Sequence, residues 1–157
     1  MEFGGTFLNK RLNKGNNGGT TRRTTDVFQL ATAVLFQNPI QNFALAPNNL
    51  TDAPQLCLDF LKEIPTEWDE VKYIDGYPGK YVVLARRSGD KWYVAAINAE
   101  KETLKLNVDL SFLGDQTVKW YGDDKNQRPQ LTDKKLKSGK PVALTIASQG
   151  GVVIVAE

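Results

Sequence analysis

The sequence predicts a mainly β protein, in which a C-terminal antiparallel β-sandwich of about seven strands follows two helices. Three observations support this fold class. Apolar residues recur at helical spacing only before Pro65, they alternate with a period of two after it, and short polar turns separate the alternating runs. We therefore expect two parts, a helical and loop-rich segment over residues 1–64 and a β-sandwich domain over residues 65–157.

The first helix is predicted to follow a glycine-rich leader. Residues 1–23 have little apolar periodicity beyond residues 3–8 and are rich in Gly, Asn, Thr and Arg, and we expect a flexible loop over residues 13–23. Thr24 or Thr25 can cap the helix, Asp26 lies in the first turn where the helix dipole favours an acid, and Pro39 ends the segment. The apolar residues of this helix form an unusually wide stripe: Val27, Phe28, Leu30, Ala31, Val34, Leu35 and Phe36.

A second helix is predicted between Thr51-Asp52 and Pro65, with Pro54 near its start and the run QLCLDFLKEI as its body. Two helices with broad apolar faces cannot bury those faces against each other alone. We therefore expect them to need a partner outside this chain, or to remain exposed and mobile together with residues 1–23.

The β-sandwich domain begins with period-two alternation after Pro65. Residues 80–98 form a hairpin around Ser88-Gly89-Asp90-Lys91, and neither face of this hairpin is polar. We expect it to be central, with one face packed on an opposing sheet and the other covered by helices or a neighbouring domain. The other predicted strands lie within residues 68–76, 102–110, 116–123, 141–147 and 150–157.

Composition excludes several classes of function. The net charge is +2, and Lys and Arg are scattered among nearly as many Asp and Glu, so no nucleic-acid partner is expected. The chain contains no histidine, which excludes a Ser-His-Asp triad and any metal site that needs imidazole. No apolar stretch approaches the roughly 20 residues that span a bilayer, and the opening MEFGGTFLNK does not resemble an export signal. We expect no membrane span and no signal peptide in this chain.

A few side chains carry functional hypotheses. Trp120 and Tyr121 lie at a predicted strand end and are candidates for carbohydrate contact through an exposed aromatic ring. Trp68, at the junction between helix and sheet, is expected to pack between the β-domain and whatever lies beneath it. Cys57 lies in an apolar run and is expected to be a small buried hydrophobe rather than a reactive thiol.

Three stretches point to one family: TTDVFQLATAVLFQNPIQNFALAPNNL, FLKEIPTEWDEVKYIDGYPGKYVVLARRSGDKWYVAAIN and the closing GGVVIVAE. Together they resemble the C-terminal part of glycoside hydrolase family 97, the α-glucosidase and α-galactosidase family typified by starch-utilisation enzymes of gut Bacteroides. The resemblance covers essentially the whole chain. It implies a parent enzyme with an N-terminal β-sandwich, a catalytic (β/α)8 barrel and a C-terminal antiparallel β-domain that is sometimes described as an oligomerisation domain.

The resemblance identifies residues 1–64 as the end of the barrel, with residues 25–37 as an outer helix and Glu2 as a candidate at the barrel rim. The family hydrolyses α-glycosidic bonds with acidic residues beside a calcium ion, and the resemblance places those residues upstream of Met1. Asp123-Asp124 follows a strand and is expected to form a turn rather than bind calcium. We therefore expect no catalytic residue, no metal site and no cofactor in this chain.

The predicted function is that of a non-catalytic C-terminal part of a family 97 α-glycosidase, with a structural, domain-packing or oligomerisation role. Its expected partner is the rest of the barrel, or a second copy that associates through residues 24–64. The family resemblance implies a periplasmic or secreted protein. The alternative is a carbohydrate-binding β-sandwich module that binds an oligosaccharide through exposed aromatics.

Overall fold

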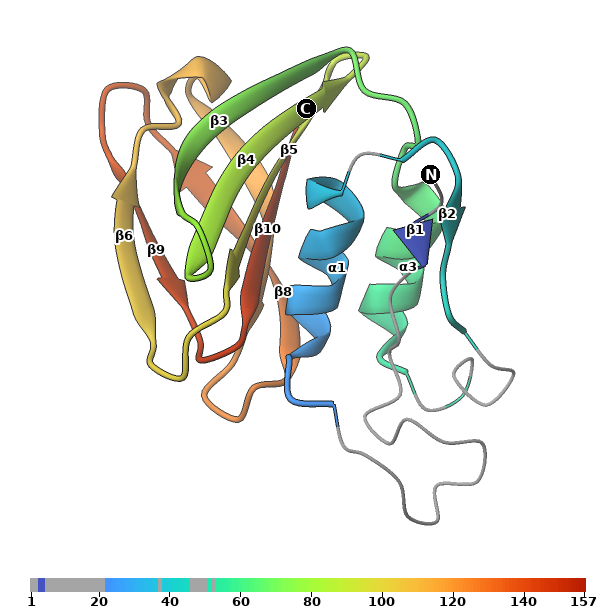
Figure 1. The fold of residues 1–157 in the computed structure, drawn as a ribbon. Coiled ribbons are helices and arrows are strands. Elements are labelled where there is room, and N and C mark those ends of the chain that lie inside the picture. The colour runs from blue at the N-terminus through green and yellow to red at the C-terminus, as the bar shows by residue number, and fades with distance from the viewer. Residues whose placement is uncertain (1–2, 5–21, 37, 46–50, 52) are drawn as a thin grey trace.

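The computed structural model describes residues 3–4, 22–36, 38–45, 51 and 53–157. The described chain is mainly β, and its strands form a sandwich with helices on one outer face (Figure 1). Glu2 and most of the predicted leader lie outside the described residues. The helices are α1 (Asp26–Leu35), α3 (Gln55–Glu63) and the short 3-10 helix η1 (Ser111–Leu113).

Eight strands build the sandwich. The larger sheet has the order β3-β4-β5-β10-β7-β8, the smaller sheet consists of β6 and β9, and every neighbouring pair is antiparallel. A separate parallel pair joins β1 (Phe3–Gly4) to β2 (Gln41–Asn42). The strands of the sandwich are β3 (Glu70–Tyr77), β4 (Tyr81–Ser88), β5 (Lys91–Asn98), β6 (Leu104–Val108), β7 (Gln116–Asp123), β8 (Pro129–Leu136), β9 (Val142–Ile146) and β10 (Gly151–Ala156).

The expected count of about seven strands misses β8. This strand lies at the edge of the larger sheet, where only β7 pairs with it. Its side chains are exposed from Gln130 to Lys135, and only Leu136 at its end is buried. An edge strand of this kind needs no apolar alternation, so the period of two that reveals the other strands is absent from its sequence.

The hairpin of β4 and β5 is central, as predicted, and its two faces contribute to two different cores. Val83 and Val94 point into the core between the two sheets. Leu84 and Tyr93 point to the opposite face, where they pack with residues of α1 and α3. Because both faces are covered, neither arm of the hairpin shows a polar face in the sequence.

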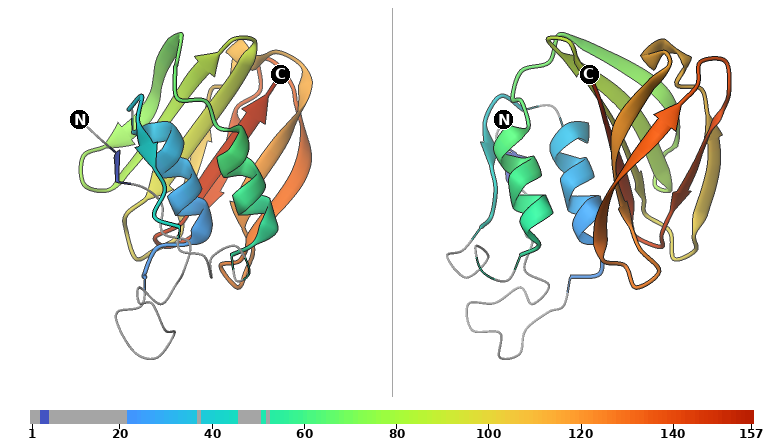
Figure 2. Two further views of the ribbon diagram at one scale, coloured as in Figure 1. Left: turned by 90° about the vertical axis from the view of Figure 1, so that its right-hand side faces the viewer. Right: turned by 180° about the vertical axis from the view of Figure 1, so that it is seen from behind.

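The helices find their cover within the chain, so the expectation that they lack a partner is wrong. α1 packs against β5 and β10, and α3 lies beside α1 and reaches β8 (Figure 2). The apolar stripe of α1 is buried almost completely, including Leu30 and Val34. The physical reason is that the outer face of the larger sheet is itself apolar, and it supplies the surface that the helices need.

The N-terminus of α1 is tied to the ends of β7 and β10. Thr25 caps the helix by accepting a hydrogen bond from the Phe28 backbone N–H at 3.1 Å, as the sequence predicted. The Thr25 hydroxyl also donates to Asp123 Oδ2 at 2.9 Å, and the same oxygen accepts the Gly151 backbone N–H at 3.3 Å. These contacts fix where the helix crosses the sheet.

Candidate functional site

The two sheets of the sandwich differ in width, and this difference shapes its surface. β9 of the smaller sheet packs against β5 and β10, near the middle of the larger sheet. The smaller sheet therefore does not cover the whole inner face of the larger sheet. It leaves β3 open on one side, and β7 and β8 open on the other. A hollow is found at each of these two open sides.

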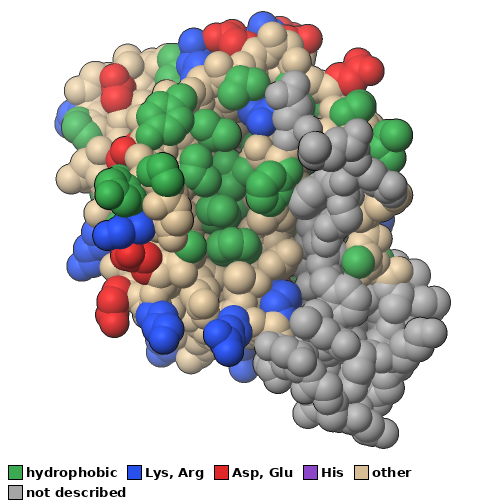
Figure 3. Space-filling view, viewed as in Figure 1, with side chains coloured by type: hydrophobic (Ala, Val, Ile, Leu, Met, Phe, Trp, Pro, Cys, Tyr) green, Lys and Arg blue, Asp and Glu red, His purple; other side chains and the backbone are tan. Residues whose placement is uncertain are grey.

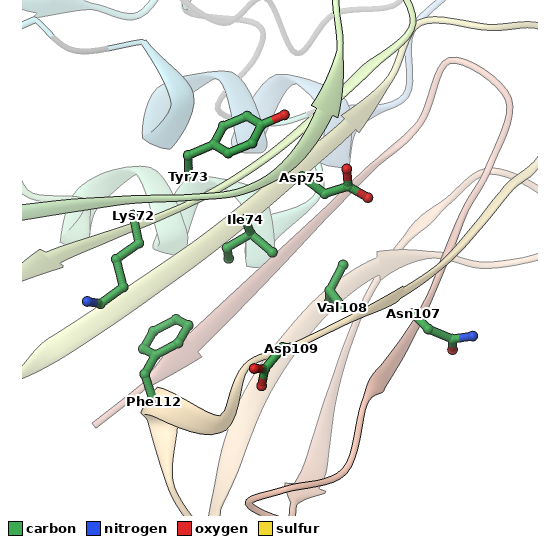
Figure 4. A pocket seen from close by; sticks show the side chains of 8 residues that line it. All are labelled: Lys72, Tyr73, Ile74, Asp75, Asn107, Val108, Asp109 and Phe112. Atoms are coloured by element: carbon green, nitrogen blue, oxygen red, sulfur yellow. The ribbon is translucent and has the colours of Figure 1, made fainter.

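The hollow on the β3 side has a volume of about 320 Å³ (Figure 4). Figure 4 shows Ile74 and Phe112 turned toward each other from β3 and η1, while Tyr73 points to the other side of its strand. The complete lining is Lys72, Tyr73, Ile74, Asp75, Asn107, Val108, Asp109 and Phe112.

The charged groups of this hollow serve local structure. Asp75 Oδ1 accepts the Gly76 backbone N–H at 2.8 Å and the Tyr81 hydroxyl at 3.3 Å. The Ser111 backbone N–H donates to Asp109 Oδ1 at 2.8 Å, and this bond holds the pKa of the Asp109 carboxyl below its usual value. A carboxyl whose pKa is lowered stays ionised and is a poor general acid. Asp109 is therefore unsuited to the role of the protonated acid that glycoside hydrolysis requires.

Trp120 and Tyr121 do not lie at an exposed strand end as the sequence analysis assumed. Trp120 is only 6% exposed and faces the space between the sheets, whereas Tyr121 is 7% exposed and faces the helices. Tyr121 packs edge-to-face on Phe60 with ring centroids 5.1 Å apart, and burial raises its pKa. Strand alternation sends the two rings to opposite faces, so they cannot form one stacking platform. Their contact with carbohydrate stays a prediction.

Cys57 and Asp124, the other residues considered in the sequence analysis, both have structural roles. Cys57 is fully buried, as predicted, and burial raises the pKa of its thiol to about 12. Asp124 closes a turn by accepting the Asn126 and Arg128 backbone N–H groups. Among the described residues, no three His, Cys, Asp or Glu side chains are grouped as a metal site requires.

The side chain of Trp68 packs where the sequence predicted, at the junction between helix and sheet. Its ring meets Tyr93 edge-to-face at 5.4 Å, and the Arg86 guanidinium lies 5.9 Å from its centroid. Arg86 is 4% exposed, and burial lowers its pKa. The burial of Arg86 gives no local signal in the sequence, where Arg86 and Arg87 stand side by side at the end of an apolar run.

An apolar face lies next to this junction, on the helix side of β3 and β4. Val71 and Tyr73 pair with Arg86 and Leu84, so they share the face on which the helices pack. Tyr73 is nevertheless 67% exposed, because the helices cover β5 and β10 and leave β3 open. Figure 3 shows apolar side chains gathered over β3 and β4. We call the surface formed by Val71, Tyr73 and Leu84 the β3 face.

Comparison with known proteins identifies the family. The family model described as "Glycosyl-hydrolase 97 C-terminal, oligomerisation" matches residues 67–157, which is more than half of the chain. The chain belongs to glycoside hydrolase family 97. The resemblance found in the sequence is therefore confirmed, and the family description names oligomerisation, as expected for this β-domain.

Relatives of known activity agree with this family. A retaining alpha-galactosidase of Bacteroides thetaiotaomicron is 43% identical over 89 residues, which are 57% of this chain and 13% of that protein. The crystal structure of a beta-arabinopyranosidase is 63% identical, has a TM-score of 0.95 and is matched over 99% of this chain and 25% of its own. A family 97 enzyme from Pseudoalteromonas sp. strain K8 shares the fold, with 24% identity and a TM-score of 0.83 over 100% of this chain and 26% of its own.

The chain thus spans about an eighth of the curated galactosidase and a quarter of the two crystallised enzymes. Within the described residues, neither helix has the length and apolar character that crossing a bilayer requires.

Proposed function

We propose that this chain is the non-catalytic C-terminal part of a family 97 glycosidase, in which residues 1–64 complete the catalytic barrel and the sandwich holds subunits or domains together. The observation that carries this proposal is the β3 face, an apolar surface left open beside the helices of a domain whose family description names oligomerisation. Monomeric soluble proteins seldom leave such a patch uncovered.

A non-catalytic role agrees with the carboxylates of the described residues. Hydrolysis of an α-glycoside needs two carboxyl groups on opposite sides of the bond, roughly 5 to 9.5 Å apart, and one of them must be protonated before reaction. Asp75 and Asp109 in the open hollow are held by backbone N–H groups instead. We propose that the acidic residues and the calcium ion of the parent enzyme belong to parts outside this chain.

The parent enzyme is proposed to be a retaining glycosidase for α-galactosides or β-arabinopyranosides. Relatives with these two activities match this chain at 43% and 63% identity. The two substrates are closely related, because a β-L-arabinopyranoside is an α-D-galactopyranoside that lacks the hydroxymethyl group at C5. An active site that accepts one ring needs little change to accept the other. We also propose a periplasmic or secreted location, which the family resemblance implies.

Sedimentation of the 157-residue chain tests the assembly role. We expect association at micromolar concentration, and we expect Tyr73→Lys to shift the chain to a monomer, because a charge on the β3 face cannot be buried without a partner. Tyr77→Lys is the matched control. Tyr77 is on the same strand and is 60% exposed, but it pairs with Tyr81 beyond the irregularity in the register of β3.

A hydrolysis assay completes the test. We expect the chain to release no nitrophenol above the buffer rate from nitrophenyl α-galactoside, β-L-arabinopyranoside or α-glucoside, with calcium present. Clear turnover would overturn the non-catalytic role. A chain that stays monomeric at all concentrations, or association that both lysine variants abolish equally, would overturn the role of the β3 face.

A further inference from the structure

A groove runs along the second open side of the sandwich, between β8 and the free edge of β9. It consists of two adjoining hollows of about 320 Å³ and 290 Å³ that share Trp120, Lys134 and Ala143. Each hollow is near the lower limit of the volumes found for small-molecule sites. We call it the β8 groove, and neither the family description nor the relatives assign it a role.

One end of the β8 groove is strongly basic. Four lysines line it, and no carboxylate does, as the full lining shows: Trp120, Lys134, Lys135, Leu136, Lys137, Lys140, Pro141, Val142 and Ala143. None of these lysines has a carboxylate partner within 4.0 Å in the part of the chain that the structure describes. The nearby Asp115 carboxylate accepts the Ser138 backbone N–H at 2.6 Å. By contrast, Lys91 on β5 pairs with Glu157 at 2.7 Å.

Lys134 is the central cation of this end. It pairs with the buried Val118 across β7 and β8, which places its side chain on the inner face of the sheet. Its Nζ lies 3.5 Å from the ring centroid of Trp120, a close cation–π contact. Partial desolvation lowers the pKa of Lys134. An anion in the groove would lie against a cation that has already lost part of its water.

The other end of the groove offers uncharged hydrogen-bonding groups. It is lined by Trp120, Gly122, Asp123, Gln130, Thr132, Lys134, Ala143 and Thr145. The single acid, Asp123, accepts the Thr25 hydroxyl and the Gly151 backbone N–H. Gly122 leaves space in this hollow next to Trp120, since a Cβ at position 122 would lie 3.2 Å from Trp120 Nε1. Two threonines and a glutamine suit a ligand that carries hydroxyl groups.

We propose that the β8 groove binds an acidic saccharide, with its carboxylate or sulfate group against Lys134, Lys137 and Lys140 and its hydroxyls against Thr132, Thr145 and Gln130. The competing explanation is protection of an edge strand, because inward-pointing and exposed lysines prevent pairing with another chain. Protection of the edge needs only positive charge. It predicts no saturable site and no preference for one anion over another.

The test is a calorimetric and NMR titration of the chain at low salt with three probes. Trigalacturonate presents carboxylates, a sulfated galactobiose presents sulfate, and galactotriose is the neutral control. We expect saturable binding of an acidic probe with shifts concentrated at residues 118–145, and no binding of galactotriose. The stronger acidic probe identifies the anionic group. Affinity should fall as salt rises, because the contact is charged.

Matched variants locate the site. Lys134→Gln is expected to weaken binding of the acidic probe by about tenfold, since it removes one charge-assisted hydrogen bond. The double variant Lys137→Gln/Lys140→Gln removes two and should weaken binding by at least about tenfold. Lys105→Gln on β6 is the control and should leave affinity unchanged. Lys137 and Lys140 lie in the turn after β8, so the double variant still tests the site if Lys134→Gln impairs folding.

Three results would each overturn the proposal. One is the absence of saturation by both acidic probes, which favours edge protection. Another is equal binding of galactotriose, which would make the groove a neutral-sugar site. The third is an equal loss in Lys105→Gln, which would mean binding to lysines in general.

Discussion

The guanidinium of Arg86 donates a hydrogen bond of 3.0 Å to the backbone carbonyl of Leu35, the last residue of α1. This bond joins the central hairpin to the C-terminal end of a helix 51 residues earlier in the chain. The last carbonyls of a helix lack partners within the helix, and the dipole there favours a cation. Arg86 therefore satisfies a backbone acceptor and fixes the end of α1 on the sheet.

We predict that Arg86→Gln lowers the free energy of unfolding by about 1–3 kcal/mol, because a buried carbonyl loses a charged donor. Urea unfolding followed by circular dichroism measures the change. Arg87→Gln is the control, since the ion pairs of Arg87 with Asp69 and Glu70 and its hydrogen bond to the Gly89 carbonyl are partly or fully exposed, and the change in stability should be less than about 1 kcal/mol. Equal losses in the two variants would argue against this role of Arg86.

Gly151 lies where the backbone of α1 approaches β10 closely. A Cβ at this position would lie 2.7 Å from Phe28 Cα and 2.7 Å from the Val27 carbonyl oxygen, both of which are backbone atoms. Gly151→Ala must therefore push the helix away, and we expect a loss of about 1–3 kcal/mol in unfolding free energy. Hydrogen exchange should rise in residues 26–35.

Gly122→Ala is the control for this prediction. A Cβ at Gly122 would meet only the Trp120 side chain, at 3.2 Å and 3.5 Å, and a side chain can shift more easily than a helix backbone. We expect a smaller loss and unchanged exchange in α1. An unaffected Gly151→Ala variant would mean that α1 does not pack on β10 in solution.

The contact between Thr25 and Asp123 gives a third prediction. Thr25→Ala removes both the cap of α1 and the hydrogen bond to Asp123 Oδ2. We expect the free energy of unfolding, measured by thermal unfolding, to fall by about 1–2 kcal/mol. The exposed Thr66→Ala variant should be neutral. A double-mutant cycle with Asp123→Asn measures the coupling between the two residues. Strict additivity would show that the cap acts alone.

Local sequence patterns correctly predicted the elements that are set by interactions between residues close together in the chain. The cap at Thr25 and the prolines around α3 are short-range signals, and the hairpin turn at Gly89 adopts the positive φ of 58° that glycine favours. β8 was missed because its residues face solvent at an edge and need no alternation.

The errors came from long-range contacts that no local pattern contains. Trp120 is buried in the core between the two sheets, and α1 is covered by β5 and β10 far along the chain. The basic end of the β8 groove was visible as the run DKKLKSGK. Only the fold brings this run against an indole ring.

The last prediction concerns the buried thiol of Cys57, whose pKa rises from 9.0 to about 12, chiefly through desolvation and then through the charge of Asp26. In the unfolded chain this thiol ionises above pH 9.0, while in the folded chain it keeps its proton until about pH 12. The unfolded state therefore binds fewer protons in this interval, and the thiol lowers the free energy of unfolding as the pH rises. The contribution of the protonated, buried thiol to the stability of the fold is fully present below pH 9.0 and is lost as the pH rises toward 12.

We expect the unfolding free energy to fall by at most about 1.4 kcal/mol per pH unit from this group in that interval. Cys57→Ala should show a shallower fall than the parent chain, although Tyr93 and Tyr121, whose pKa values are also raised by burial, will keep part of it. Urea unfolding at a series of alkaline pH values measures both slopes. Identical slopes in the two proteins would show that the thiol is already accessible to water in the folded state, and rapid reaction of Cys57 with a thiol reagent below pH 9.0 would lead to the same conclusion.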